Sequence, residues 1–193
     1  TKFESTGVIG FFSDGTLCSG ALAADENLSP VAFVSKSTIL ATGGACALYE
    51  RTTNPEGATG EGIALAYYAG AEIADMEFVQ FHPTAFYNEN GASFLISEAV
   101  RGEGAHLLDS GGKHFMHNYS ELGELAPRDL VSRAIYMEMK KSGRDYVHLD
   151  MRHLDPAYIK TRFSNIYQAC LAYGVDMTGG LVPVAPAAHY TIG

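Results

Sequence analysis

The amino-acid sequence predicts an α+β fold, in which a β-meander precedes a longer segment of mixed strands and helices. Three apolar runs in the first 44 residues are separated by turn-forming residues, as in adjacent antiparallel strands. From about residue 76 onward, helical periodicity alternates with short extended runs. Of the 193 residues, 47% are hydrophobic and 18% are charged, which is typical of a globular chain.

The meander is predicted from the spacing of its apolar runs. Residues 7–12 and 17–24 form the first two strands, and residues 13–15 (Ser-Asp-Gly) form the turn between them. The third run covers residues 31–41 and ends in residues 42–44 (Thr-Gly-Gly). These glycines either let a ligand approach the backbone closely or form an ordinary turn, and the pattern alone leaves both readings open.

Helices and strands alternate in the rest of the chain. The sequence predicts a glycine-rich entry into a helix over residues 57–70, an extended segment over 76–84 broken by Pro83, a helix over 125–141, a strand over 146–150, a helix from 155 to a stop at Gly174, and an extended run over 181–184. The helix over 125–141 is the clearest, because Val131, Ile135 and Met139 repeat at intervals of four and Gly143 follows.

Four polar clusters bounded by glycine, proline or small residues are the candidate functional segments. They cover residues 80–84, 97–104, 126–129 and 187–191. We expect loops that converge on a small anion. Arg128 falls in the first turn of a predicted helix, where the helix dipole disfavours a cation, so either it has a functional role or it is an exposed arginine paired with Asp129 or Glu124.

Other motifs are weaker. His114 and His117, with His106 nearby, have loose spacing and no neighbouring carboxylate or cysteine, so we predict surface histidines and no metal site. Ser97 lies in no G-x-S-x-G elbow, which argues against a hydrolase triad with Glu98 and a histidine. No G-x-G-x-x-G fingerprint occurs, so any dinucleotide site is incomplete.

Composition excludes several classes of function. The net charge of −9 argues against a nucleic-acid surface. Cys18, Cys46 and Cys170 are odd in number and form no C-x-x-C motif, so we expect a reduced, cytoplasmic protein without a disulfide framework. No apolar run approaches the roughly 20 residues that span a bilayer, so we expect no membrane partner.

The ordered phrases of the chain resemble the flavoprotein family that contains succinate dehydrogenase, fumarate reductase and aspartate oxidase subunits. They are Thr38–Gly44, Thr52–Pro55, Gly60–Gly62, Gln80–Thr84, Glu98–Gly104 and Pro127–Asp129. Two further phrases, Glu124–Asp129 and Pro186–Thr191, are more similar to the aspartate oxidase branch. The resemblance implies that residues 1–75 are the later part of an FAD-binding domain, 76–190 a capping domain, and 191–193 the return toward the FAD-binding domain.

The resemblance also implies roles for individual residues. Catalytic roles fall to Arg128 as the general acid/base, with Glu98 and Arg101 on the proton route. Substrate-binding roles fall to Gln80, His82, Thr84, Ser97 and His189. Contacts with the FAD cofactor fall to Glu61, Thr42, Gly43 and Gly44.

The implied reaction is the flavin-dependent oxidation of L-aspartate to iminoaspartate, the first step of NAD biosynthesis. L-Aspartate or fumarate is then the dicarboxylate ligand, and iminoaspartate would be handed to quinolinate synthase. We also expect the chain to be a fragment that holds FAD weakly and is inactive alone. Two alternatives are a fumarate reductase or succinate dehydrogenase flavoprotein subunit, and a non-catalytic dicarboxylate-binding module.

Overall fold

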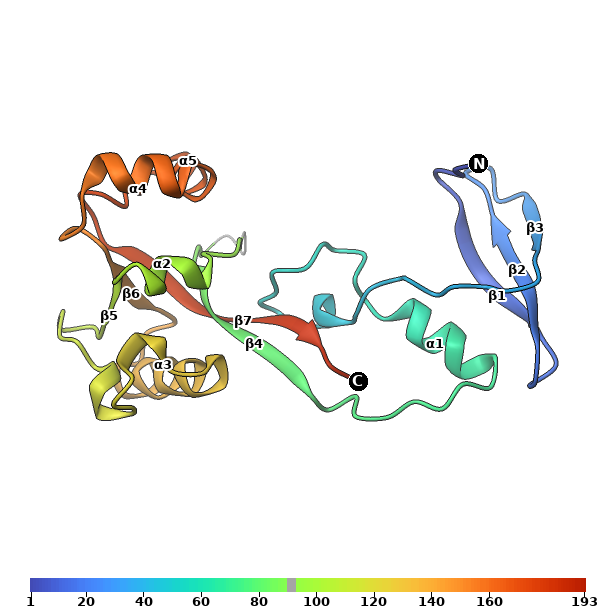
Figure 1. Cartoon of the computed structure of the whole chain (residues 1–193), viewed down its shortest axis with the longest axis horizontal. Coiled ribbons are helices and arrows are strands. Elements are labelled where there is room, and N and C mark those ends of the chain that lie inside the picture. Colours follow the sequence, from blue (N-terminus) through green and yellow to red (C-terminus); the bar gives the residue numbers. More distant parts are fainter. Residues whose placement is uncertain (90–92) are drawn as a thin grey trace. The chain divides into compact units, whose positions relative to one another are not determined.

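The computed structural model describes residues 1–89 and 93–193, which fall into two compact units (Figure 1). Unit 1 comprises Thr1–Leu48, Pro55–Val79 and Thr191–Gly193, and unit 2 comprises Tyr49–Asn54 and Gln80–Tyr190. Both contain strands and helices, so the predicted α+β class is confirmed.

In unit 1 a three-stranded antiparallel sheet is followed by a short helix. Its elements are β1 (Gly7–Ser13), β2 (Cys18–Ala24), β3 (Pro30–Val34), the 3-10 turn η1 (Cys46–Leu48) and α1 (Glu61–Tyr68). The sheet order β1-β2-β3 is the expected meander. However, β3 ends at Val34 and not at residue 41, because the chain beyond Ser35 has no strand partner among the described residues.

Unit 2 is built around a four-stranded sheet with the order β4-β7-β6-β5 (Figure 1). Its elements are β4 (Val79–Phe86), α2 (Glu98–Gly102), β5 (His106–Leu108), the 3-10 turns η2 (Met116–Asn118) and η3 (Gly123–Leu125), α3 (Arg128–Ser142), β6 (Val147–Asp150), α4 (Pro156–Arg162), α5 (Ser164–Ala172) and β7 (Val182–Thr191). The sheet pairs β5 with β6 and β6 with β7 in antiparallel register.

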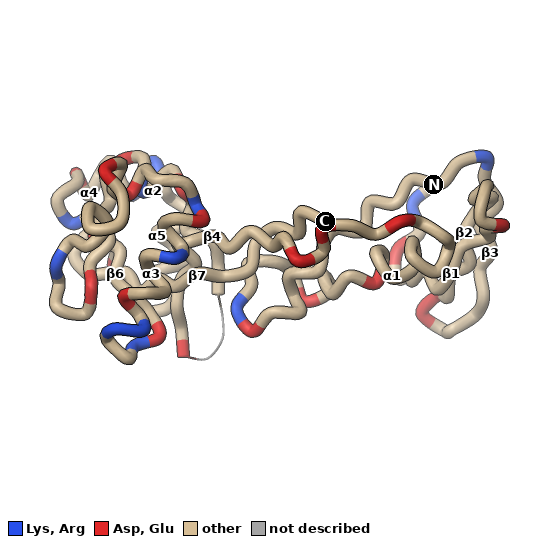
Figure 2. The backbone as a smooth tube through the Cα atoms, turned by 90° about the horizontal axis from the view of Figure 1, so that it is seen from below, with Lys and Arg blue, Asp and Glu red and all other residues tan. Residues whose placement is uncertain are grey.

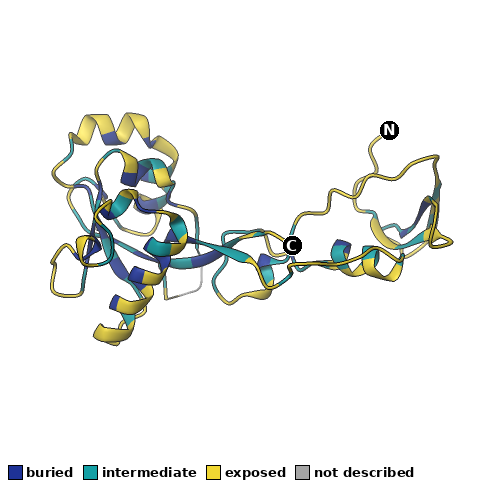
Figure 3. Cartoon of the chain, turned by 60° about the horizontal axis from the view of Figure 1, so that its bottom comes forward, coloured by how far each residue is buried: buried dark blue, intermediate teal, exposed yellow. Residues whose placement is uncertain are grey.

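Most of the buried apolar side chains of unit 2 form one core between the sheet and its helices (Figure 3). Leu107 and Leu149 from the sheet and Ile135 from α3 have no exposed surface. Burying a leucine or isoleucine side chain stabilises a fold by roughly 1.5–3 kcal/mol. This core holds α2 and α3 against β4, and those elements carry the polar clusters.

Several predicted boundaries were wrong, each for a physical reason. Pro83 does not break the segment over 76–84 but lies inside β4, an edge strand, where a missing N–H is tolerated. The helix predicted from residue 155 to 174 is two helices, because Phe163 leaves the helical conformation with φ −120° and ψ 37°. The run over 181–184 is the start of β7, a strand of ten residues whose prolines at 183 and 186 are not typical of a long strand.

The start of α3 also differs from the prediction. Leu125 ends the turn η3, and Pro127 is the N-cap residue of α3, so the helix begins at Arg128. Its C-terminus agrees with the prediction, since Lys140 and Lys141 lie in the last turn and Gly143 caps it with φ 67°.

Acidic and basic residues are interspersed along the described backbone (Figure 2). The chain has 22 acidic and 13 basic residues in all. Among the described residues, no helix combines the length and the apolar character that crossing a membrane requires.

Candidate active site

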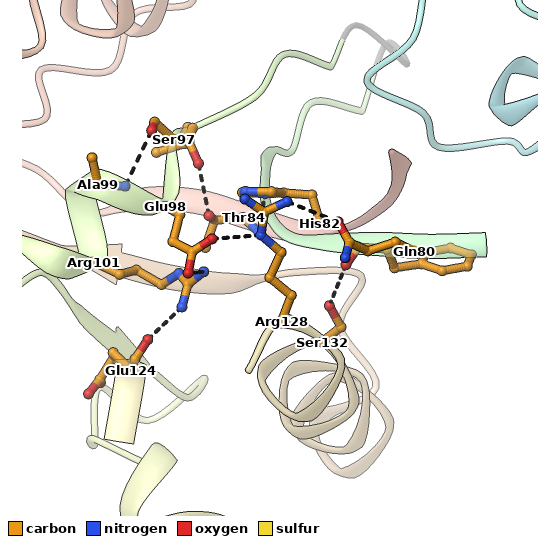
Figure 4. Close-up of polar contacts among 12 residues, drawn as sticks. Gln80, His82, Thr84, Ser97, Glu98, Ala99, Arg101, Glu124, Arg128 and Ser132 are labelled. Atoms are coloured by element: carbon orange, nitrogen blue, oxygen red, sulfur yellow. Dashed lines mark hydrogen bonds and ion pairs between the residues drawn. The ribbon is translucent and has the colours of Figure 1, made fainter. Parts of the chain in front are cut away.

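Three elements of unit 2 bring most of the predicted site residues together (Figure 4). Gln80 and His82 lie on β4, Glu98 and Arg101 on α2, and Arg128 is the first residue of α3. The helix α2 begins where the Ser97 hydroxyl accepts a hydrogen bond of 3.2 Å from the backbone N–H of Ala99. Because α2 starts at this cap, Glu98 and Arg101, which are three residues apart, lie on one side of the short helix.

The side chains of Arg128, Glu98 and Arg101 form a continuous polar chain (Figure 4). Arg128 Nε donates to Glu98 Oε2 at 2.6 Å, and Arg101 Nη2 lies 4.0 Å from Glu98 Oε1. A second donor of Arg128, Nη1, binds Gln80 Oε1 at 2.9 Å. Glu98 is therefore the bridge between two guanidinium groups.

Of these three charged side chains, that of Arg101 is the most buried, with 1% of its surface exposed. Its Nη1 donates to the main-chain carbonyl of Glu124, whereas Nε and Nη2 have no hydrogen-bond partner among the described residues. Burial lowers the pKa of Arg101, and nearby Arg128 lowers it further, while Glu98 opposes both. A buried guanidinium with open donors is a strong site for an anion.

His82 offers a second open donor. The backbone N–H of Thr84 donates to His82 Nδ1 at 3.2 Å, so a neutral imidazole carries its proton on Nε2. That Nε2 is buried and has no partner in the described part of the chain. Burial, helped by Arg128, His189 and Arg101, lowers the pKa of His82 to about 3, so the ring stays neutral at physiological pH.

His189 on β7 lies beside His82, with their ring centroids 5.3 Å apart. Its Nδ1 contacts the hydroxyl of Thr53 at 2.7 Å, and its main-chain carbonyl accepts from Asn54 Nδ2 at 2.8 Å. Burial lowers the pKa of His189, and Arg128 lowers it further. Segment 49–54 therefore fixes the orientation of this imidazole.

The hydroxyl groups of the site residues already make local contacts. Thr84 is buried and donates to the carbonyl of Ile96 at 3.0 Å, which ties β4 to the residue before Ser97. Ser132 on α3 donates to the carbonyl of Phe81 at 3.0 Å and ties α3 to β4. These two bonds hold the three elements in place around Arg128.

The site has an excess of positive charge. Arg128 and Arg101 face a single carboxylate, Glu98, whose pKa is lowered chiefly by the hydrogen bond from Arg128. The two neighbouring histidines have lowered pKa values and remain uncharged donors or acceptors. The arrangement can bind an anion through charge-assisted hydrogen bonds and can pass a proton along Arg128, Glu98 and Arg101.

The four residues predicted to contact a cofactor lie together in unit 1, at the start of α1. A Cβ at Gly62 would lie 1.8 Å from the hydroxyl oxygen of Thr42, so the Thr42 side chain packs directly against the backbone of Gly62. Gly43 has φ 76°, which favours glycine. Gly44 likewise packs against Thr191, where a Cβ would lie 2.6 Å from the hydroxyl oxygen.

This part of unit 1 fits a flavin nucleotide in its chemistry. The helix α1 has no hydrogen bond from a side chain of its N-cap residue, Gly60, and a helix N-terminus of this kind favours an anionic group. Glu61 is the first residue of α1 and is exposed, and the Thr59 hydroxyl beside it lowers its pKa. A helix N-terminus and an ionised carboxylate match the phosphate and hydroxyl groups of a dinucleotide.

Some residues of the site were not found from the sequence. Thr53 and Asn54 stand out in the sequence only as part of a family motif, yet both contact His189. The sequence offers Glu124 as a surface partner of Arg128, but in the structure the main-chain carbonyl of Glu124 accepts a hydrogen bond from Arg101. Sequence spacing carries no signal for these contacts, since they join residues 23 to 136 positions apart.

Comparison with known proteins identifies the family of the chain. The family model described as FAD binding domain matches residues 3–193. The chain is 51% identical over 180 residues to L-aspartate oxidase 1 of Ralstonia nicotianae, which covers 93% of this chain and 34% of that protein. It is 47% identical over 177 residues to L-aspartate oxidase of Pseudomonas aeruginosa, covering 91% of this chain and 33% of that protein.

Solved structures show the same fold. The chain superposes on the quinol fumarate reductase of E. coli with a TM-score of 0.86 and 34% identity, covering 96% of this chain and 35% of that one. A second quinol-fumarate reductase, solved with menaquinol, gives a TM-score of 0.88, 34% identity and coverage of 99% and 36%. The chain spans about a third of the length of the curated relatives it matches. It belongs to the family of FAD-binding domains.

Proposed function

We propose that this chain forms the substrate-holding part of a flavin-dependent L-aspartate oxidase. The overall reaction is the oxidation of L-aspartate to iminoaspartate, in which bound FAD supplies the chemistry by accepting a hydride from C2 of the substrate. The similarity to L-aspartate oxidases supports the reaction. The geometry of unit 2 supports the part of it that this chain performs.

One observation carries the proposal: among the described residues, three buried donors near Arg128 have no acceptor. They are His82 Nε2, Arg101 Nε and Arg101 Nη2. Leaving a buried donor unpaired costs roughly 1–3 kcal/mol, and more for a charged group, so such donors point to a ligand. A dicarboxylate offers four oxygens to satisfy them, and Arg128 and His189 extend the same donor set.

The proton step falls to the chain of three residues. Arg128 passes one of its own protons to Glu98 through the contact of 2.6 Å and takes up the proton that the substrate loses. The lowered pKa of Glu98 keeps its carboxylate ionised in the resting site, paired with Arg128. Arg101, 4.0 Å beyond, lines this route by stabilising that carboxylate, and the carbonyl of Glu124 holds Arg101 in place.

Substrate choice is assigned to Gln80 and the two histidines. Gln80 Oε1 accepts from Arg128, so its amide nitrogen remains as a donor at the same place. His82 and His189 donate or accept without charge at neutral pH. Ser97 and Thr84, whose hydroxyls bind locally, act mainly by positioning α2 and β4 around the substrate.

Cofactor binding is assigned to the cluster of residues at the start of α1 in unit 1. Thr42, Gly43, Gly44 and Glu61 would contact FAD through the open backbone of unit 1. We accordingly assign residues 1–75 and 191–193 to the FAD-binding domain and residues 76–190 to a capping domain.

Substrate turnover in the natural full-length protein tests the proposal. We expect L-aspartate to reduce the bound flavin and succinate not to do so. Reduction by succinate in place of aspartate would favour a fumarate reductase or succinate dehydrogenase subunit, which the structural neighbours make the second candidate. Binding of dicarboxylates without any flavin reduction would favour a non-catalytic module.

Release of the product suggests a partner. Iminoaspartate is an imine and hydrolyses in water, so we propose its hand-off to quinolinate synthase in the cytoplasm. A coupled assay of the two proteins measures the quinolinate formed per aspartate oxidised. A yield that does not depend on the concentration of the second protein would contradict a direct hand-off.

A further inference from the structure

A second polar cluster lies in unit 2, outside the chain of Arg128, Glu98 and Arg101. His106, His114 and Glu124 each present one ligand atom, and these three atoms lie within 4.8 Å of one another. His106 begins β5, His114 lies on the segment that returns beside it, and Glu124 lies in η3.

The backbone holds the two histidines on one face. Leu108 pairs with His114 in an antiparallel bridge, so His106, two residues before Leu108, projects to the same side as His114. Their ring centroids are 4.4 Å apart. His106 Nδ1 lies 3.9 Å from Glu124 Oε1, and the backbone N–H of Leu107 holds that oxygen at 2.9 Å.

The surroundings of Glu124 favour a cation. Only 11% of its side-chain surface is exposed, and among residues 1–89 and 93–193 its one basic partner within 4.0 Å is His106. Arg101 donates to the main-chain carbonyl of Glu124, and the Glu124 carboxylate acts on Arg101 by raising its pKa, without an ion pair within 4.0 Å among the described residues. A metal ion between this mostly buried carboxylate and the two imidazoles would give it a positive partner in direct contact.

We propose that His106, His114 and Glu124 bind one Zn²⁺ ion, with water as the fourth ligand. Two histidines and a glutamate are a known zinc ligand set that leaves one position open. Zinc–ligand bonds of about 2.0–2.2 Å place tetrahedral ligand atoms about 3.4 Å apart, so the present atoms close in by about 1.4 Å at most. His114 is exposed and can change its rotamer to make this adjustment.

His117 does not join this site. Its ring lies against Gly123, where a Cβ would be 3.1 Å from His117 Cε1. The sequence pattern favoured surface histidines over a metal pair of His114 and His117, because no carboxylate or cysteine completes that pair. The fold replaces His117 with His106 and supplies the carboxylate from Glu124.

Zinc titration of the metal-stripped protein, against a competing chromophoric chelator, tests the proposal. We expect one equivalent to bind, and His114→Ala or Glu124→Gln to weaken binding by about tenfold or more. His117→Ala is the matched control and should bind zinc as the wild type does. Absence of stoichiometric binding, or an equal loss in His114→Ala and His117→Ala, would overturn the site.

Cobalt substitution tests the coordination separately. Co²⁺ in a four-coordinate site gives intense visible absorption bands, which we expect in the wild-type protein and in His117→Ala. They should be absent in His114→Ala, whose exposed side chain is not needed for folding. A weak spectrum typical of six-coordinate cobalt in the wild type would refute the proposed tetrahedral geometry. Neither readout depends on flavin or on turnover, so failure here leaves the proposed oxidase function untouched.

Discussion

His82 is held as a neutral imidazole in a cationic surrounding. Its Nδ1 accepts from the backbone, its Nε2 is buried without a partner among the described residues, and its pKa falls to about 3. Burial, and then the nearby arginines, keep it neutral, and its neutrality in turn lets it approach Arg128 and Arg101 without further repulsion. Single residues thus set the charge of the site.

Replacing Arg128 with lysine tests the proton step. Lysine keeps the charge but loses the forked geometry that joins Glu98 Oε2 and Gln80 Oε1. We expect kcat for aspartate oxidation to fall by about 10²-fold or more, the usual size of a general acid–base contribution. The control is Arg133→Lys, an exposed arginine on the same helix. Near wild-type turnover in Arg128→Lys would remove the acid/base role.

His82 also predicts a pH dependence of stability. Its folded pKa of about 3 lies below the unfolded value of 6.5, so the unfolded state binds more protons between those values. Stability should therefore fall as the pH drops from 6.5 toward 3, and this cost vanishes above 6.5. In His82→Gln the free energy of unfolding, measured in urea, should vary less steeply over this window. An unchanged slope would mean that His82 is not buried as a neutral ring.

At the scale of elements, short segments position the chemistry. The helix α2 has only five residues, so its stability depends on its cap and on packing against the core. The turn η3 presents the carbonyl of Glu124 to Arg101, and α3 starts at the residue that contacts Glu98. Moving any of these ends by one residue would misplace a guanidinium.

Removing the cap of α2 should therefore affect both stability and activity. Ser97→Ala loses the hydrogen bond to Ala99 and should lower the free energy of unfolding by about 1 kcal/mol. Ser97→Thr keeps a hydroxyl and should retain most of that stability. Urea denaturation measures both variants. An alanine variant as stable as the threonine variant would show that the cap does not hold α2.

At the scale of the whole molecule, the two units differ in how far they bury their apolar side chains. Unit 2 buries a continuous core of sheet and helix side chains, whereas unit 1 exposes large apolar residues such as Ile39 and Tyr68, which are 90% and 83% exposed. Stability of the candidate site should accordingly follow the core of unit 2.

A core substitution tests this dependence. Leu149 on β6 has no exposed surface, so Leu149→Ala should cost about 2–5 kcal/mol through lost contacts and a cavity. Leu171 on α5 is 38% exposed, and Leu171→Ala is the control with a smaller effect. Thermal unfolding followed by circular dichroism compares the two. Equal losses would argue against a single core that supports the site.

Local pattern and motif order were enough to predict much of this protein. Turn residues between apolar runs identify the meander, periodicity with a glycine stop identifies the C-terminal end of α3, and ordered phrases identify the family. These features depend on neighbours in the chain, so the sequence contains them directly. The ends of the elements could not be predicted in this way. Pro83 is tolerated because β4 is an edge strand, and Phe163 is buried where two helices meet, and neither fact is contained in the neighbouring residues.

Only the tertiary structure decided which side chains meet. It joined Arg128 to Gln80 across 48 positions and gave His189 its partner Thr53 across 136, and in the described part of the chain it left His82 Nε2 without an acceptor. It also brought Glu124 to His106 and His114 in place of His117. Contacts of this range depend on how helices pack against a sheet, and no spacing in the sequence records that packing.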